Sequence, residues 1–216
     1  MIATVAALRI EEARRYCGKS GEAWRACGDA QLAILRAAGC QPTDDVLEVG
    51  AGALSGTRAL AEYLAPGKLV AIEPHRWLVD AALCDPDTAR LMAERRVRFL
   101  FRDDFDATET ERTFAFALSH SVLAHAAHWQ AAQMLTALRR VLAPGADLVA
   151  SLRLRERPSY DTEWQYPGNS WFSLGAIVDI AHGCGFAVNP RPEWQVIMTA
   201  ACPTSVHDWL SFRRLP

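Results

Sequence analysis

The sequence predicts an α/β fold of three layers, in which helices cover both faces of a mostly parallel sheet of seven strands. Short apolar runs alternate along the chain with longer stretches that carry apolar residues at helical spacing. Most of the runs are apolar nearly throughout, as expected for parallel strands that are buried on both faces. The length of 216 residues, half of them hydrophobic, favours one domain over residues 1–216.

The expected elements follow in chain order. Residues 1–40 are expected to form a cap of two or three helices, broken at residues 18–21, ahead of a core over residues 41–216. The expected strands are 45–49, 68–73, 97–101, 114–119, 147–154, 186–190 and 195–201. The expected helices of the core are 55–64, 76–84, 126–142 and 173–183. Residues 155–172 show no period and are expected to form a long loop, which is often a functional segment.

Composition excludes several classes of partner. A net charge of −2 and a pI near 6.3 give no overall attraction to nucleic acids or to anionic membranes. The apolar start is interrupted at Arg9, too early for a membrane span or a secretion signal. The six cysteines are scattered without CxxC pairs, so we expect a cytoplasmic protein with free thiols and no metal. The oligomeric state is left open, a homodimer included.

The segment DVLEVGAGALSGTR, residues 45–58, predicts a turn that cradles a nucleotide-like ligand. Gly50 and Gly52 follow an apolar strand, and glycine allows the backbone to lie against a bound molecule. The GxGxxG spacing of dinucleotide-binding turns is absent, because its third glycine would fall at Ser55. The carboxylate of Glu48 disfavours a pyrophosphate, which points to a ligand with positive charge and no phosphate. S-adenosyl-L-methionine (SAM) meets both conditions.

Glu73 ends the next expected strand, 68–73. A carboxylate at the carboxyl end of a parallel strand can accept hydrogen bonds from both hydroxyls of a ribose. Dinucleotide and SAM sites share this feature, and the plain alternative is a solvated strand end.

With these residues in hand, the chain resembles the class I SAM-dependent methyltransferases and, among them, a small bacterial subgroup. VLEVGAGALSGTR and AIEPHRWL resemble the subgroup's "IGCGSLRGGR" and "GIEPNKWL". The resemblance implies a Rossmann-like sheet with a final antiparallel strand, an N-terminal helical lid, SAM as cofactor and S-adenosylhomocysteine (SAH) as product. The chain departs from the motif at Ala51, Ser55, Thr57 and His75, so the resemblance does not identify the acceptor.

The resemblance also implies a set of cofactor contacts. Asp104 corresponds to an acidic residue that binds the adenine amino group, with Phe105 on the ring, although a charged turn followed by a core Phe is the alternative. FAFALSHSVLAH resembles the family's "FDYALAQSVFTHL", which places residues 119–121 beside the methionine portion. The expected cofactor residues are Glu48, Gly50, Gly52, Leu54, Glu73, Pro74, His75, Asp104, Phe105, Ser119 and Ser121.

Methyl transfer is an in-line displacement that depends mostly on positioning the two reactants and excluding water. A hydroxyl acceptor gains from a general base, for which histidine is suited. His120 follows the strand 114–119 at the expected ligand crevice and is the first candidate, with a hydrogen bond to cofactor or backbone as the alternative. His125 and His128 lack a third ligand nearby and are interpreted as structural.

Aromatic side chains in the loop 155–172 are expected to roof the acceptor pocket. The alternative is a satellite hydrophobic cluster under a long loop. Trp24, in the N-terminal helices, is expected to cover the site from the other side. The expected acceptor contacts are Trp24, Tyr160, Trp164, Tyr166 and Trp171.

The sequence therefore predicts a SAM-dependent methyltransferase acting on oxygen or nitrogen of a small molecule, in biosynthesis, with secondary metabolism as one setting. Residues 119–122 read SHSV, where DNA and RNA amino-group methyltransferases carry Asn/Asp-Pro-Pro-aromatic. Two alternatives stay open. One is a SAM-binding enzyme that catalyses a cyclisation or elimination, and the other is a non-catalytic SAM-binding partner protein.

Overall fold

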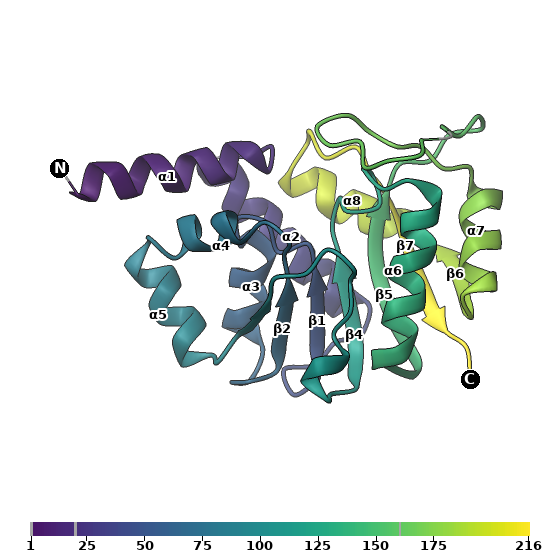
Figure 1. Ribbon diagram of the computed structural model, residues 1–216, viewed down its shortest axis with the longest axis horizontal. Coiled ribbons are helices and arrows are strands. Elements are labelled where there is room, and N and C mark those ends of the chain that lie inside the picture. Colours follow the sequence, from purple (N-terminus) through teal and green to yellow (C-terminus); the bar gives the residue numbers. More distant parts are fainter. Residues whose placement is uncertain (1, 20, 160) are drawn as a thin grey trace.

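A seven-stranded sheet forms the middle of the molecule in the computed structural model, which describes residues 2–19, 21–159 and 161–216 (Figure 1). Its strands are β1 Val46–Val49, β2 Leu69–Ile72, β3 Arg98–Leu100, β4 Phe114–Ser119, β5 Leu142–Leu152, β6 Phe186–Pro190 and β7 Asp208–Arg214. They lie in the order β3-β2-β1-β4-β5-β7-β6. All neighbours from β3 to β5 pair in parallel, whereas β7 runs antiparallel to β5 and to β6. The mostly parallel sheet with an antiparallel last strand is thus confirmed.

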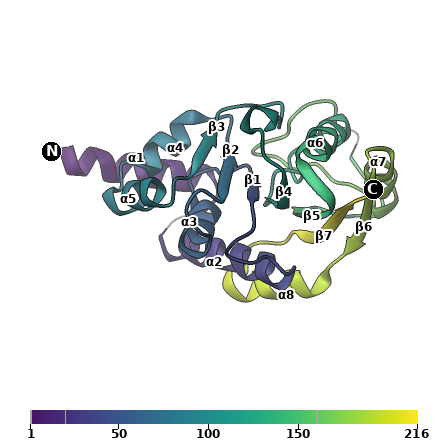
Figure 2. The same ribbon diagram turned by 90° about the horizontal axis from the view of Figure 1, so that it is seen from below.

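Helices cover both faces of this sheet, as the three-layer prediction requires. They are α1 Ile2–Tyr16, α2 Gly21–Ala37, α3 Ser55–Tyr63, α4 Arg76–Ala82, α5 Pro86–Glu94, α6 His128–Val141, α7 Leu174–Gly183 and α8 Pro192–Ala201, with a short 3-10 helix at Thr108–Thr110. Seen end-on, α2, α3 and α8 lie on one face and α6 and α7 on the other (Figure 2). Helix α1 packs along α4 and carries the N-terminus away from the sheet (Figure 1). Within the described part of the chain, no helix is long and apolar enough to cross a membrane.

The alternation of β1 divides the core between the two faces. Leu47 and Val49 pack in the cluster that contains Met134 of α6, whereas Val46 packs in the cluster that contains Ile34 of α2. Successive side chains of a strand point to opposite faces, so Glu48 shares the face of Val46 and is directed toward α2 and α3. This alternation places the Glu48 carboxylate on the side of the sheet that faces α2 and α3.

The predicted strand 195–201 is wrong, because this segment lies in helix α8. Pro192 occupies the first turn, where a missing N–H costs nothing. Trp194 and Met198 share one buried face at helical spacing, while Val196, whose β-branched side chain favoured a strand, is 68% exposed.

The place of that strand is taken by β7, which the sequence analysis did not predict. Its Trp209, Leu210 and Phe212 are buried between β5 and β6. Helix α5 was also missed, although Asp85 gives it a cap by accepting a hydrogen bond from the Thr88 N–H at 3.0 Å. The predicted break of the N-terminal helices at residues 18–21 is confirmed, since α1 ends at Tyr16 and α2 begins at Gly21.

Candidate functional site

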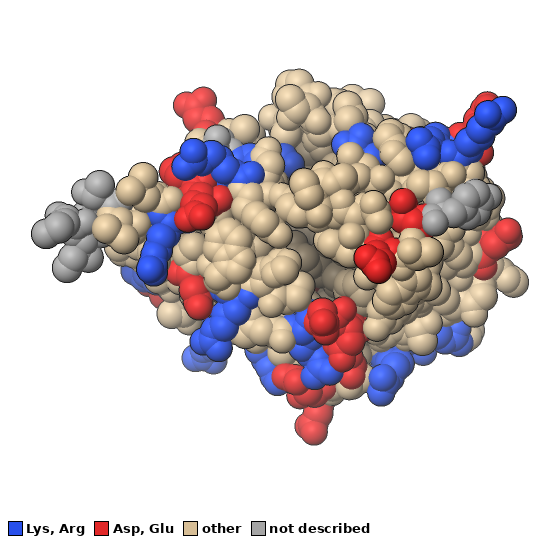
Figure 3. Space-filling view, turned by 45° about the horizontal axis from the view of Figure 1, so that its top comes forward, with Lys and Arg blue, Asp and Glu red and all other residues tan. Residues whose placement is uncertain are grey.

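A cavity of about 890 Å³ opens at the carboxyl edge of the parallel strands. Its lining comes from the ends of β1, β2, β4 and β5, from the α1–α2 connection, from the loop 155–172 and from the segment before β7. Figure 3 shows this side of the molecule, which is hollowed in the middle. The volume lies in the upper part of the range of small-molecule sites.

The glycine turn forms the floor of the cavity through three positive φ angles at alternate residues. They are 83° at Gly50, 53° at Gly52 and 65° at Leu54. A Cβ on Gly50 would lie 2.4 Å from Cγ2 of Val122, so this position requires glycine. Gly50 and Gly52 line the cavity, whereas Leu54 is fully buried as the N-cap of α3. Leu54 therefore supports the turn from the core and does not face the cavity.

Glu73 lines the cavity and holds the turn in place. Its Oε2 accepts a hydrogen bond from the Gly52 N–H at 2.7 Å, and its Oε1 accepts one from the His75 N–H at 2.9 Å. Burial raises the pKa of this carboxyl, and the two backbone N–H groups oppose that rise. Each carboxylate oxygen keeps a second acceptor site, so both ribose hydroxyls could still donate to Glu73.

Glu48 lies beneath the turn, on the face of β1 that meets α2 and α3. Its Oε2 accepts a hydrogen bond from the Thr57 hydroxyl at 2.6 Å. Burial raises the pKa of Glu48 to about 7, although the hydrogen bond from Thr57 favours the ionised form. A cationic group in the cavity would stabilise the carboxylate.

We expect Glu48→Gln to stabilise the ligand-free protein at neutral pH. The folded pKa of Glu48, about 7, lies above its ordinary value of 4.5, so the stability from the protonated form is complete below pH 4.5 and is lost as the pH rises toward 7. The slope is up to about 1.4 kcal/mol per pH unit, or about 2 kcal/mol between about pH 5 and about pH 6.5.

Urea unfolding of the wild type and of Glu48→Gln at the two pH values measures this difference. The contributions of all other titrating groups are the same in both proteins and cancel. The exposed Glu94 supplies the control variant Glu94→Gln, which makes the same chemical change at the surface. Parallel pH profiles of wild type and Glu48→Gln would contradict the prediction.

The acidic loop that follows β3 lies at the edge of the cavity. Asp103 and Phe105 both line it, whereas Asp104 does not. Asp104 instead accepts two hydrogen bonds from the guanidinium of Arg102, at 2.8 and 2.5 Å, and this pairing lowers its pKa to about 2. The adenine contact expected of Asp104 stays a prediction, with its neighbour Asp103 better placed to make it.

His120 lines the cavity and is half-buried. Its ring stacks on Trp209 at 5.5 Å and meets the edge of His207 at 5.5 Å. Burial lowers the pKa of His120 well below its ordinary value, so the imidazole is neutral at physiological pH. Its Nε2 has no hydrogen-bond partner among residues 2–19, 21–159 and 161–216.

The two serines beside His120 differ in their placement. Ser121 lines the cavity, where its N–H donates to the Ser151 hydroxyl at 2.8 Å and its hydroxyl lies 3.3 Å from Nδ1 of His207. Ser119 is buried and does not line the cavity. Only Ser121 is therefore positioned to contact a ligand directly.

The predicted aromatic roof is present in part. Trp164 and Tyr166 line the cavity, and the Tyr166 ring lies 4.9 Å from that of Tyr16 at the end of α1. Trp24 lines it from α2, with its indole N–H donating to the Ala53 carbonyl at 3.0 Å. Trp171 does not line it, and Tyr160 lies outside the described residues.

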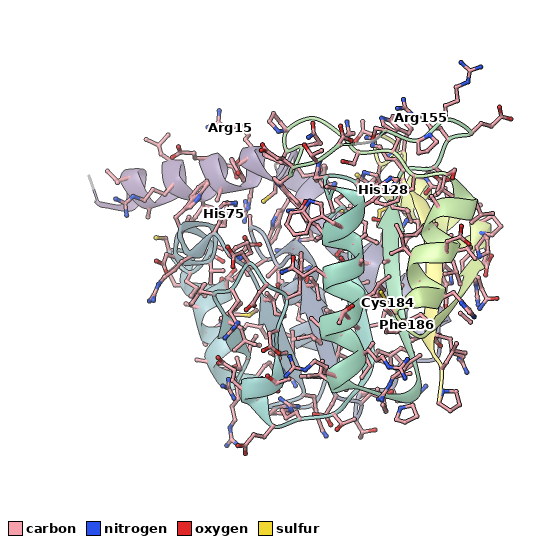
Figure 4. The ribbon with its side chains drawn as sticks, turned by 45° about the vertical axis from the view of Figure 1, so that its right-hand side comes forward. Arg15, His75, His128, Arg155, Cys184 and Phe186 are labelled. Atoms are coloured by element: carbon pink, nitrogen blue, oxygen red, sulfur yellow. The ribbon has the colours of Figure 1, made fainter. Side chains whose placement is uncertain are left out.

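Pro74 and His75 connect the Glu73 side of the cavity to this roof. Both line the cavity, and the ring of His75, which Figure 4 labels, lies 6.0 Å from that of Tyr16. His75 therefore lies where β2 meets α4, under the end of the N-terminal helix.

Lys19, Arg153 and His207 are among the cavity residues that the sequence analysis missed. Arg153 follows β5 directly, so the rule that ligands bind at the carboxyl ends of strands could have identified it. Lys19 and His207 lie in connections that show no pattern. In the described part of the chain, no group of three or more His, Cys, Asp or Glu residues could hold a metal ion.

Comparison with known proteins shows similarity in structure only. No protein-family model matches the chain, and no curated protein matches it in sequence. The magnesium protoporphyrin IX methyltransferase of Synechocystis PCC 6803 with bound SAM superposes with a TM-score of 0.61 at 17% identity, over 87% of this chain and 77% of that one. The DhpI–SAH complex gives 0.64 at 16% identity, over 100% and 97%. The CcbJ methyltransferase of Streptomyces caelestis gives 0.62 at 13% identity, over 87% and 89%. The chain therefore has the Rossmann-like fold of SAM-dependent methyltransferases, as its sequence predicted.

Proposed function

We propose that the protein is a SAM-dependent methyltransferase that transfers a methyl group to oxygen or nitrogen of a small molecule and releases SAH. The observation that carries this proposal is the cavity floor, where Glu73 and the glycine turn are joined by the 2.7 Å hydrogen bond from Gly52. Such a floor suits a nucleoside, and the buried carboxylate of Glu48 suits a ligand with positive charge. The structural neighbours include methyltransferases holding SAM or SAH, which supports the same cofactor here.

The setting that we propose is biosynthesis in the cytoplasm, secondary metabolism included, by a one-domain enzyme with residues 1–40 as its cap. All six cysteines are free thiols, which suits a reducing compartment. The cavity suits a small acceptor and not a nucleic acid or a membrane surface. Whether two copies associate is a matter for sedimentation measurements.

In the proposed mechanism, the protein positions the reactants and excludes water. Glu73 and the turn would hold the nucleoside, and the sulfonium of SAM makes its methyl group electrophilic. Tyr16 and Tyr166 close the cavity above. For a hydroxyl acceptor, the neutral imidazole of His120 would take the proton at Nε2 as the new bond forms. An amine acceptor with a free lone pair would need no base.

The test of this function starts with calorimetric titration of the wild-type protein with SAH and with NAD. We expect SAH to bind at micromolar concentration and NAD not to bind. Incubation with methyl-labelled SAM and a panel of phenols, amines and carboxylic acids should then give a labelled product. Tight NAD binding without SAH binding would overturn the proposal, and consumption of SAM without methyl transfer would favour a non-methylation reaction.

The two neighbouring aspartates provide a matched pair of variants for the adenine end. We expect Asp103→Asn to weaken SAH binding about tenfold, or about 1.4 kcal/mol, because it removes a charged acceptor from the cavity. Asp104→Asn should change SAH binding less than threefold, since its carboxylate is engaged by Arg102. Calorimetry on both variants measures this order, and the reverse order would identify Asp104 as the adenine ligand.

A further inference from the structure

The two ends of the cavity carry opposite charge. Glu48, Glu73 and Asp103 lie at the end formed by β1, β2 and the segment after β3. Arg102 also lines this end, but its guanidinium is paired with Asp104. At the other end, Arg153 follows β5 and lies near His207 and His125, and Lys19 adds a second positive charge that acts on His207. The acidic end suits the positive charge of SAM, so the basic end is left for the acceptor.

The charged guanidinium of Arg153 packs on an aromatic ring and has no carboxylate partner among the described residues. Its guanidinium lies over the ring of Trp171, 5.4 Å from the centroid. In residues 2–19, 21–159 and 161–216, no carboxylate forms an ion pair with Arg153, and its Nε is buried without a hydrogen-bond partner. Leaving buried donors of a charged group unpaired is costly, so an anion in the cavity would be stabilised there.

The neighbours of Arg153 in the cavity add hydrogen bonds but no opposing charge. Burial and the positive charge of Arg153 both lower the pKa of His207, to about 3. Burial is also the main cause that lowers the pKa of His125, whose Nδ1 donates to the Gly168 carbonyl at 2.7 Å. Both imidazoles are therefore neutral. Neither carries a negative charge that would compete with an anionic ligand for the guanidinium of Arg153.

We propose that the methyl acceptor carries a carboxylate or a similar oxyanion, which Arg153 binds at the end of the cavity opposite Glu73. This inference rests on the proposed function and narrows its substrate class. A guanidinium that stacks on an aromatic ring keeps its edge free for bidentate hydrogen bonds to a carboxylate. Arg153 is thus a specificity-determining residue, and it would orient the acceptor with respect to His120.

Arg155 provides the matched control. Its guanidinium lies over the same Trp171 ring, 5.0 Å from the centroid. It is exposed in the loop above the sheet and does not line the cavity (Figure 4). Substitution at either position removes one arginine from Trp171, and only substitution of Arg153 removes a charge from the cavity.

The experiment compares two acid–amide pairs, benzoate with benzamide and 3-phenylpropanoate with 3-phenylpropanamide. Each compound is titrated into wild type, R153Q, R153K and R155Q, both with saturating SAH and without it. We expect the wild type and R155Q to bind at least one acid about tenfold more tightly than its amide, which is about 1.4 kcal/mol. R153Q should lose this preference, and R153K should keep part of it.

Separate SAH titrations distinguish this inference from the proposed function. R153Q should bind SAH within twofold of the wild type and keep its melting temperature. If R153Q loses SAH affinity while it stays folded, Arg153 serves the cofactor and the inference fails. The inference also fails if the wild type prefers neither acid, or if R153Q prefers acids as the wild type does. Failure of wild-type protein to bind SAH would instead sink the proposed function.

Discussion

Glu73→Ala is expected to weaken SAH binding about a hundredfold. Two hydrogen bonds from ribose hydroxyls to a carboxylate contribute about 1.5–3 kcal/mol each, and a hundredfold loss corresponds to about 2.8 kcal/mol. The variant also removes the acceptors for the N–H groups of Gly52 and His75, so the turn loses its anchor. Calorimetric titration with SAH measures the loss.

Two further variants separate the loss of a ligand contact from the loss of the turn. Glu73→Gln keeps the shape of the side chain and one acceptor oxygen, so its SAH affinity should fall between those of wild type and Glu73→Ala. Glu94→Ala removes an exposed carboxylate of α5 and should leave the affinity unchanged. An affinity of Glu73→Ala within threefold of the wild type would remove Glu73 from the cofactor site.

Gly28→Ala is expected to destabilise the fold by about 3 kcal/mol, the upper part of the range for overpacking. Helix α2 crosses α3 so closely here that a Cβ on Gly28 would lie 2.0 Å from the carbonyl oxygen of Ser55. That oxygen belongs to the backbone, so the two helices must separate. The gain in helix propensity from Gly to Ala, about 1 kcal/mol, offsets only part of the cost.

Gly175→Ala is the control for this prediction, because Gly175 also lies in a helix and a Cβ there would meet no atom within 4 Å. We expect this variant to be neutral or slightly stabilised. Urea unfolding measures both variants, with the change read from the midpoint at constant m value. A Gly28→Ala midpoint equal to that of the wild type would contradict the close packing of α2 on α3.

Local patterns of the sequence were sufficient for the parallel half of the sheet and for the placement of Glu73 and the glycine turn at the cavity. β1, β2 and β4 are near-continuous apolar runs, and Glu73 and the glycine turn follow from their ends. The antiparallel edge was harder to predict. The apolar stretch of α8 fits a helix or a strand, and only the packing of its Trp194 and Met198 into the core decides between them.

The Arg153 end of the cavity was harder to predict, because most of its residues are brought together only by the fold. Lys19, Arg153 and His207 come from the α1–α2 connection, the end of β5 and the segment before β7. Asp103 and Asp104 pose a different problem, since they are adjacent and chemically identical. The hydrogen bonds of Arg102 to Asp104 distinguish them, and no sequence pattern contains that information.

The contact between Tyr16 and Tyr166 has a consequence for the speed of ligand exchange. It joins the end of α1 to the loop 155–172 across the top of the cavity, with ring centroids 4.9 Å apart. An aromatic pair contributes about 0.5–1.5 kcal/mol, so this pair by itself would favour the joined form by only about fivefold. The contact between the two rings is therefore weak enough to break by thermal motion alone, so a ligand bound in the cavity could pass between them without help from a partner protein or a second ligand.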